Sequence, residues 1–136
     1  MMNAEKKVVL VTGGSRGIGR ACCYRFAADG AKVYVNYASR PDAAEETVAE
    51  CIRLGGEAES LAFNVADSKA VDEAFAQIKE NDGKIDVLVN NAGITSDGIF
   101  IRFKDEDWDR VLDINLKGSF CCARAAAKMM MKARQG

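Results

Sequence analysis

The amino-acid sequence predicts an α/β fold, a doubly wound parallel sheet with helices on both faces. Short apolar runs alternate with longer amphipathic segments along the chain, and strands that alternate with helices of about 10–15 residues are typical of βαβ units. The first apolar run leads into a glycine-rich loop, VTGGSRGIGRA at residues 11–21. Because 136 residues suffice for one domain with a buried core, residues 1–136 are expected to form a single unit.

Local signals place the individual elements. The four strands are expected at residues 7–13, 31–37, 58–65 and 84–93. The four helices are expected at residues 17–28, 41 to about 54, 68–82 and about 105–132. Pro41 is typical of a first helical position, Asp67 or Ser68 supplies an N-cap, and Gly55 and Gly83 follow helix ends.

Helical spacing predicts an apolar stripe on several of these helices. The stripe residues are Ile18, Cys22 and Phe26 in the first helix, Val71, Phe75 and Ile78 in the third, and Trp108, Leu112, Asn115, Ser119, Cys122 and Ala126 in the last. Valine and leucine on both faces of the strand at 87–89 indicate a sheet that is covered on both sides.

Composition and charge exclude several classes of function. The net charge of −1 gives no field to attract nucleic acid or an acidic membrane. No apolar stretch reaches the roughly 20 residues of a membrane span, and the N-terminus lacks the pattern of a signal peptide. We therefore expect a cytoplasmic protein without nucleic-acid or membrane partners. The five cysteines lack zinc-ligand spacing and histidine is absent, so we expect reduced, buried thiols, no metal site and no imidazole base.

The glycine-rich loop predicts a dinucleotide site. Gly13, Gly17 and Gly19 lie between a strand and a helix, where a doubly wound fold binds a pyrophosphate. The unpaired N–H groups and the dipole of the helix start favour an anion there, and glycine lets phosphates approach the backbone. The alternative is a glycine-rich turn that binds no ligand.

The end of the second strand predicts NADP as the cofactor. An NAD site usually presents an acid at this point, but the segment VYVNYASR has none, and the first acid is Asp42. Arg16, Ser39 and Arg40 suit the 2′-phosphate of NADP, because arginine can bond phosphate bidentately. The alternative is that both arginines are ordinary surface charges.

Several motifs in order resemble the classical short-chain dehydrogenase/reductase family. They are TGGSRGIG at 12–19, NNAG at 90–93 and the asparagine of DINLKGSF at 115. FNVAD, IDVLVNNAGIT, DEDWDRVLDINL and AKMMMKARQG resemble its bacterial 3-oxoacyl-[acyl-carrier-protein] reductases, from about Lys7 to Gly136. The resemblance implies a Rossmann fold with its first four strands in the order 3-2-1-4. It also implies NADPH-dependent reduction of a carrier-protein-linked or CoA-linked 3-oxoacyl thioester in fatty acid synthesis, by a homo-oligomer that is a tetramer in the family.

The resemblance also implies a set of cofactor-binding residues. Those around the pyrophosphate and the adenosine ribose are Gly13, Ser15, Arg16, Ile18 and Gly19. Those near the 2′-phosphate are Tyr37, Ala38, Ser39 and Arg40. Asn64, which stands where many classical members have Asp, and Val65 would flank the adenine. Asn91, Ala92 and Gly93 would line the cofactor beyond the fourth strand; the alternative is a turn that merely ends this strand.

Asn115 is the one expected catalytic residue. An amide on an apolar stripe costs free energy unless its groups are hydrogen-bonded, so one alternative is a satisfied core amide that fixes packing. The resemblance implies instead that Asn115 positions a water in a proton relay leading to a catalytic lysine.

The serine, tyrosine and lysine that complete the family's catalytic set are not expected within these residues. The tyrosines are Tyr24, Tyr34 and Tyr37, and none has a lysine four residues later. We therefore expect the cofactor-binding half of a reductase, truncated before a fifth strand and inactive alone, whose apolar fourth strand invites association. The alternatives are another short-chain reductase acting on acetoacetyl-CoA or a sugar, a catalytically silent nucleotide-binding fragment, and an inert fragment.

Basic residues end the last helix. We expect Arg134 and Lys132 to meet an acidic carrier protein in the complete enzyme. The alternative is a solvated helix end whose cations favour the helix dipole.

Overall fold

The computed structural model describes residues 6–136 and contains one parallel sheet of four strands. The strands are β1 (Val8–Val11), β2 (Lys32–Tyr37), β3 (Glu57–Ala62) and β4 (Val87–Val89). Their order is β3-β2-β1-β4, so the predicted fold class and strand order are confirmed. Residues 1–5, on which the expectation of no signal peptide partly rests, lie outside the described residues.

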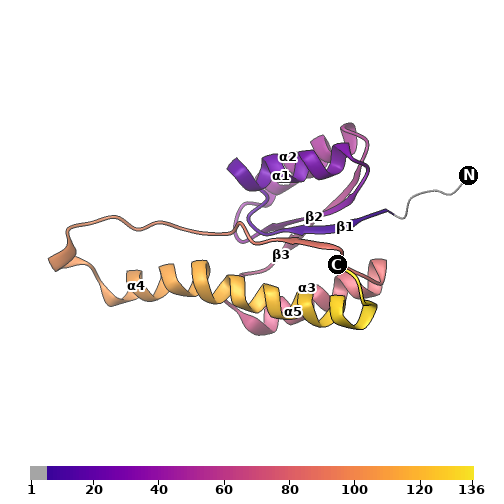
Figure 1. Cartoon of the computed structure of the whole chain (residues 1–136). Helices are drawn as coiled ribbons and strands as arrows, with labels where there is room; N and C mark the ends of the chain where they lie inside the picture. The colour runs from indigo at the N-terminus through magenta and orange to yellow at the C-terminus, as the bar shows by residue number, and fades with distance from the viewer. Residues whose placement is uncertain (1–5) are drawn as a thin grey trace, which may run out of the picture.

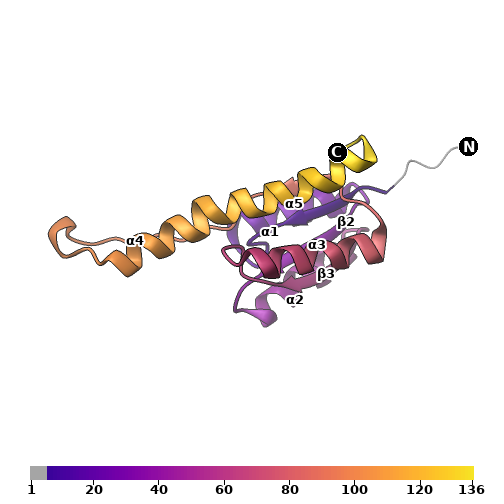
Figure 2. The ribbon, with the colours of Figure 1, turned by 90° about the horizontal axis from the view of Figure 1, so that it is seen from below.

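Helices cover both faces of the sheet, as Figures 1 and 2 show. One face carries α1 (Gly17–Ala28) and α2 (Pro41–Arg53); the other carries α3 (Ser68–Asp82) and α5 (Gly118–Ala133). Successive strand side chains point to opposite faces, so Val9 and Val11 join the core under α1 and α2, whereas Leu10 joins the core under α3 and α5.

Several local signals act as the sequence predicts. Pro41 occupies the first position of α2. The Asp67 side chain caps α3 by accepting hydrogen bonds from the N–H groups of Lys69 (3.1 Å) and Ala70 (3.2 Å). Gly83 ends α3 in the left-handed conformation, with φ of 75°. The predicted stripe of Val71, Phe75 and Ile78 is buried.

The stripe predicted for the first helix is wrong by one position. The buried residues of α1 are Gly19, Cys23 and Ala27, whereas Ile18 is 78% exposed. The helix lies so close to the strand that only small side chains fit on its inner face. Cys22 and Phe26 of the predicted stripe are partly buried against the same core, so the stripe lies at the margin of the buried face.

The long last helix is continuous, but its first part is exposed. It comprises α4 (Asp105–Leu112), a π-helical segment η2 (Asp113–Lys117) and α5. Cys122 and Ala126 are buried as predicted, but Trp108 is 58% exposed, and Leu112 and Asn115 are also exposed. In both ribbon views α4 extends beyond the sheet, accompanied only by the segment that joins β4 to it (Figures 1 and 2). The inward stripe therefore holds only for α5.

All five cysteines are free thiols, and four of them are buried. Burial is the main cause that raises the pKa of Cys23 and Cys122 to about 12, so both thiols stay protonated at neutral pH. Within residues 6–136, no helix is long and apolar enough to cross a membrane.

Candidate functional site

A cleft of about 760 Å³ opens at the carboxyl ends of the strands. The segments that follow all four strands contribute to its walls. Strand order reverses between β1 and β4, and doubly wound sheets bind ligands at such a switch point. The cleft therefore lies where the sequence predicts the dinucleotide site.

Every predicted cofactor-binding residue lines this cleft except Gly19. The lining residues from that prediction are Gly13, Ser15, Arg16, Ile18, Tyr37, Ala38, Ser39, Arg40, Asn64, Val65, Asn91, Ala92 and Gly93. Gly19 is buried directly beneath the glycine-rich loop. The structure thus brings together residues from four separate segments of the chain.

Two glycines give the loop its shape. Gly13 has a φ of 64°, a left-handed conformation that favours glycine. A Cβ on Gly19 would collide with the carbonyl oxygen of Gly13 and with the side-chain amide nitrogen of Asn91. These two positions let α1 begin directly after the loop. The unpaired N–H groups of the first turn of α1 then point toward the cleft.

Thr12 and Asn91 join the loop to the end of β4. The Thr12 hydroxyl accepts hydrogen bonds from the N–H groups of Asn91 (3.0 Å) and Ala92 (2.9 Å), and donates to the carbonyl of Val89 (3.3 Å). The Asn91 side chain donates to the carbonyls of Thr12 and Gly13, both at 3.1 Å. The alternative interpretation of NNAG is a turn that merely ends the strand. Such a turn would not account for these hydrogen bonds to the glycine-rich loop.

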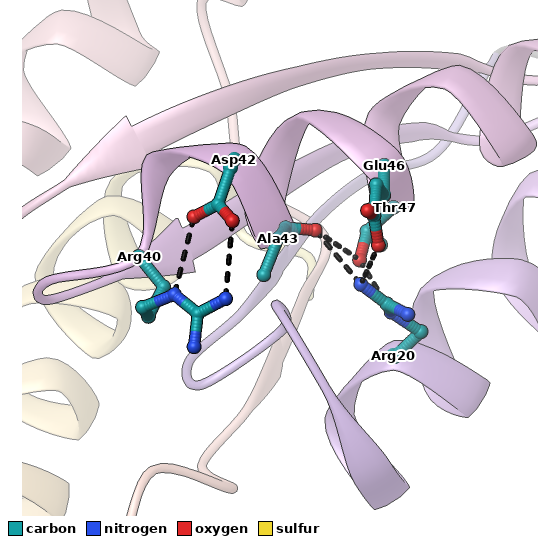
Figure 3. Close-up of polar contacts among 6 residues, drawn as sticks. All are labelled: Arg20, Arg40, Asp42, Ala43, Glu46 and Thr47. Carbon is teal, nitrogen blue, oxygen red and sulfur yellow. Dashed lines mark hydrogen bonds and ion pairs between the residues drawn. The ribbon is translucent and has the colours of Figure 1, made fainter.

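Two arginines that line the cleft, Arg20 and Arg40, bond to residues of α2 (Figure 3). The Asp42 carboxylate accepts two hydrogen bonds from the Arg40 guanidinium, 3.2 Å from Nε and 3.0 Å from Nη2. These bonds hold the pKa of Asp42 below its ordinary value, although both residues are exposed. The charge of Arg40 is thus already paired within the chain.

Arg20 reaches from α1 to three groups of α2. Its Nε donates to the Thr47 hydroxyl (2.9 Å), and its Nη2 donates to the carbonyl of Ala43 (2.9 Å) and lies 3.3 Å from the Glu46 carboxylate. Figure 3 shows the guanidinium lying against the helix. Arg20 therefore joins α1 to α2 at this side of the cleft.

Asn115 lies next to the cleft, with both ends of its amide bonded to one residue. Its Oδ1 accepts from the N–H of Ile94 (2.8 Å), and its Nδ2 donates to the carbonyl of Ile94 (2.9 Å). Its own carbonyl, in the π-helical segment, accepts from the hydroxyl of Ser119 in the first turn of α5 (3.0 Å). The side-chain amide is hydrogen-bonded at both ends, as the alternative of a satisfied core amide predicts. Its partner, however, is the backbone of a loop, and Asn115 is exposed. Its role in a proton relay stays a prediction.

The basic end of α5 lies away from the cleft. Lys132 lines a smaller hollow of about 350 Å³ with Lys79 and Gly83, at the end of α3. The chain enters β4 just after Gly83, so this hollow is at the amino edge of the sheet. Arg134 follows α5 on the same side. Within residues 6–136 neither cation lines the cleft, and their contact with a carrier protein stays a prediction.

Sequence reasoning missed several residues that line the cleft. They are Arg20, Asn36, Ala43, Glu46, Phe63, Arg110, Ile94 and Ile114. The sequence did contain a signal for Arg20. This residue follows Arg16 at a four-residue spacing, which places two side chains on the same side of a helix. Arg110 and Ile114 come from the long helix, which returns past the cleft, and nothing local in the sequence predicts that approach.

The geometry agrees with what comparison with known proteins finds. The family model described as short chain dehydrogenase matches residues 7–136. A 3-oxoacyl-[acyl-carrier-protein] reductase of Synechocystis sp. is 49% identical over 130 residues, which cover 96% of this chain and 53% of that protein. Reductases of the same name from Staphylococcus epidermidis and Staphylococcus aureus are 44% and 43% identical, with the same coverage.

The chain spans about half the length of the curated relatives it matches. The resemblance drawn from the motifs is confirmed over nearly the whole chain. Fold, glycine-rich loop and relatives agree, and the chain belongs to the short-chain dehydrogenase family.

Proposed function

We propose that residues 6–136 bind NADPH for a reductase that acts on 3-oxoacyl thioesters. The observation that carries this proposal is the cleft, because four strand ends converge there on a glycine-rich loop at a helix start. The cofactor would supply the hydride for reduction of a ketone.

The pyrophosphate would lie against the first turn of α1. The N–H of Gly13 is bonded to the Asn36 side chain (3.0 Å), and that of Gly14 to the Asn36 carbonyl (2.9 Å). The donors left for phosphate are then the first N–H groups of the helix, near Ser15 to Ile18, where the helix dipole also favours an anion.

The adenosine would lie toward β2 and β3. Residues 37–40 would surround the ribose, and Asn64 and Val65 would flank the adenine. The exposed guanidinium groups of Arg16 and Arg40 support a preference for the 2′-phosphate of NADP, since charge-assisted bonds to phosphate are strong. This preference is part of the proposal, as is each residue role.

The nicotinamide would lie toward Asn91, Ala92 and Gly93 at the end of β4. Asn115 holds Ile94, the next residue along the chain, and so supports this wall. We propose that Asn115 also positions a water for proton transfer, as the family resemblance implies.

No tyrosine of this sequence is placed to donate a proton at the nicotinamide side. Tyr34 is buried and its hydroxyl bonds Asp82, at the amino edge of the sheet. Burial, followed by this bond, raises the pKa of Tyr34 to about 12. Tyr37 lines the adenosine side. We therefore expect a polypeptide of residues 1–136 to bind NADPH without reducing a ketone at an enzymatic rate.

The substrate is proposed from the relatives, which are named 3-oxoacyl-[acyl-carrier-protein] reductases. The thioester would be linked to an acyl carrier protein or to CoA. We also propose a homo-oligomer, because the long helix exposes Leu116 (68%) and Phe120 (57%) on one side.

The test is a titration with NADPH and NADH, followed by NADPH oxidation with an acetoacetyl thioester in the protein that carries these residues. Tighter binding of NADPH and thioester-dependent oxidation are expected. NADPH binding without turnover would favour the second candidate, a nucleotide-binding module, and the absence of any nucleotide binding would overturn both.

A further inference from the structure

Asn36 is a buried polar residue that lines the cleft. It is the fifth residue of β2 and is only 2% exposed. A buried amide costs free energy unless its donors and acceptor are bonded. In this structure the Asn36 amide bonds two other segments of the chain.

The acceptor end of Asn36 holds the glycine-rich loop. Its Oδ1 accepts from the N–H of Gly13 at 3.0 Å, and its backbone carbonyl accepts from the N–H of Gly14 at 2.9 Å. Two successive N–H groups of the loop are therefore fixed to the end of β2.

The donor end of Asn36 holds the end of β3 and the residue that follows this strand. Its Nδ2 lies 3.0 Å from the carbonyl oxygen of Phe63 and 3.3 Å from that of Leu61. Phe63 directly precedes Asn64 and Val65. An amide nitrogen has two N–H groups, so both are occupied by the backbone of this segment.

We propose that Asn36 is a positioning residue for the dinucleotide, joining the pyrophosphate loop to the adenine segment through one side chain. The inference rests on the proposed function. Asn36 acts through Gly13 and Phe63, since its polar atoms are used by the backbone. It fixes both walls on either side of the ribose segment at residues 37–40, so the loop is formed before the cofactor arrives.

This role predicts a loss of affinity that does not depend on the 2′-phosphate. Both the pyrophosphate and the adenine occur in NADPH and in NADH, so both cofactors should be affected equally. A direct contact with the 2′-phosphate would weaken NADPH alone, and a purely structural residue would lower stability without changing the affinity of the folded protein.

The experiment compares Asn36→Ala with Val33→Ala in the protein that carries these residues. Val33 is fully buried on the same strand and bonds neither wall by a side chain, so it is a matched control for stability. The dissociation constants of NADPH, NADH and adenosine 2′,5′-bisphosphate are measured by titration well below the melting temperature of each variant.

For Asn36→Ala we expect all three dissociation constants to rise about tenfold, which corresponds to ~1.4 kcal/mol. Asn36→Ser, whose hydroxyl can replace one bond, should recover part of the affinity. Val33→Ala should melt at a lower temperature while its affinities stay within about twofold of the unsubstituted protein, a change of under ~0.5 kcal/mol.

Asn36→Ala with unchanged affinities, or with a loss for NADPH alone, would overturn the positioning role. If Asn36→Ala does not fold, Asn36→Ser is judged by the same criteria. Amide exchange at Gly13 in the unsubstituted protein is an independent measure, because its N–H should be protected before any nucleotide is added. Rapid exchange there would also overturn the proposal. An unsubstituted protein that binds no nucleotide would overturn the proposed function instead.

Discussion

The two edges of the same sheet are held together by different chemistry. At the carboxyl edge, neutral groups of Thr12, Asn36 and Asn91 fix the backbone of the cleft. At the amino edge, charged groups bridge the strands and helices: Lys32 lies 3.1 Å from Glu59 and 3.4 Å from Asp82.

Asp86 and its neighbours continue the charged pattern of the amino edge. The Asp86 carboxylate accepts from the N–H of Val8 at 2.8 Å and lies 3.0 Å from the ammonium of Lys84. Lys6 also pairs with Glu57 on β3. Charges at this edge compensate one another within the chain.

This difference bears on the phosphate site that we propose at the carboxyl edge. Full charges placed in the glycine-rich loop itself would either repel phosphates or compete for the cations that bind them. Neutral amides and hydroxyls fix the glycine-rich loop and leave its helix dipole uncompensated, whereas the charged pairs of the cleft, Arg20 with Glu46 and Arg40 with Asp42, lie against α2 and at its start. Substitutions at the carboxyl edge should therefore change nucleotide affinity, and those at the amino edge should change stability alone.

The largest effect is expected for Gly19→Ala. The added methyl group collides with backbone and amide atoms of Gly13 and Asn91, which cannot move without breaking the network around Thr12. We expect a loss of about 1–3 kcal/mol in unfolding free energy and no measurable NADPH binding, by urea denaturation and fluorescence titration. Ala21→Ser, on the exposed side of α1, is the control. Undiminished NADPH binding by Gly19→Ala would show that the loop does not need this close approach.

The next largest effect is expected for Arg16→Ala. Loss of one charge-assisted bond of about 1.5–3 kcal/mol should weaken NADPH roughly 10- to 100-fold and leave NADH nearly unchanged. Arg25→Ala is the matched control, because Arg25 lies on the same helix but pairs with Asp29, away from the cleft. Equal losses for NADPH and NADH would assign Arg16 to the shared pyrophosphate.

The sequence predicted the parts of this site that depend on neighbouring residues. Pro41, the Asp67 cap and Gly83 are local signals, and each acts at its predicted place. The position of the cleft also followed, because a glycine-rich loop between strand and helix is itself a local pattern.

The remaining features depend on residues that are distant in the sequence. Asn36 bonds Gly13 and Phe63 at sequence separations of 23 and 27 residues. No local sequence pattern therefore predicts the role of Asn36. The burial of Gly19 in place of Ile18 depends on how closely α1 approaches the strand ends. The exposure of α4 arises because the helix extends beyond the sheet. Helical periodicity in the sequence cannot predict this path.

A smaller effect, on stability alone, is expected at the amino edge for Asp86→Ala. The variant leaves the N–H of Val8 without its carboxylate partner, which should cost about 1–3 kcal/mol of unfolding free energy. NADPH affinity at neutral pH should not change, because Asp86 lies at the opposite edge from the cleft. A variant that lost NADPH affinity while remaining folded would break the comparison between the two edges.

The same carboxylate gives the amino edge a pH dependence. Burial alone would raise the pKa of Asp86, but the Val8 N–H and the Lys84 ammonium outweigh it, so the pKa lies below its ordinary value. A lowered folded-state pKa stabilises the protein above the unfolded value of about 3.9, and this stability is lost as the pH falls through the folded value. Denaturation curves between neutral and acid pH should show a shallower loss for Asp86→Ala than for the unsubstituted protein.

The smallest effect is expected for Asp42→Asn, and it has the opposite sign. Asp42 neutralises Arg40 through two hydrogen bonds at the adenosine side of the cleft. Exposed ion pairs contribute little, so releasing Arg40 for the 2′-phosphate should tighten NADPH binding by only roughly 1.5- to 5-fold. NADH affinity should be unchanged, because NADH has no phosphate at this position. Glu50→Gln, which removes the carboxylate that pairs with Arg53 at the far end of α2, is the control for a change of net charge. If Asp42→Asn weakens NADPH binding, the carboxylate orients Arg40 for the ligand and does not compete with it.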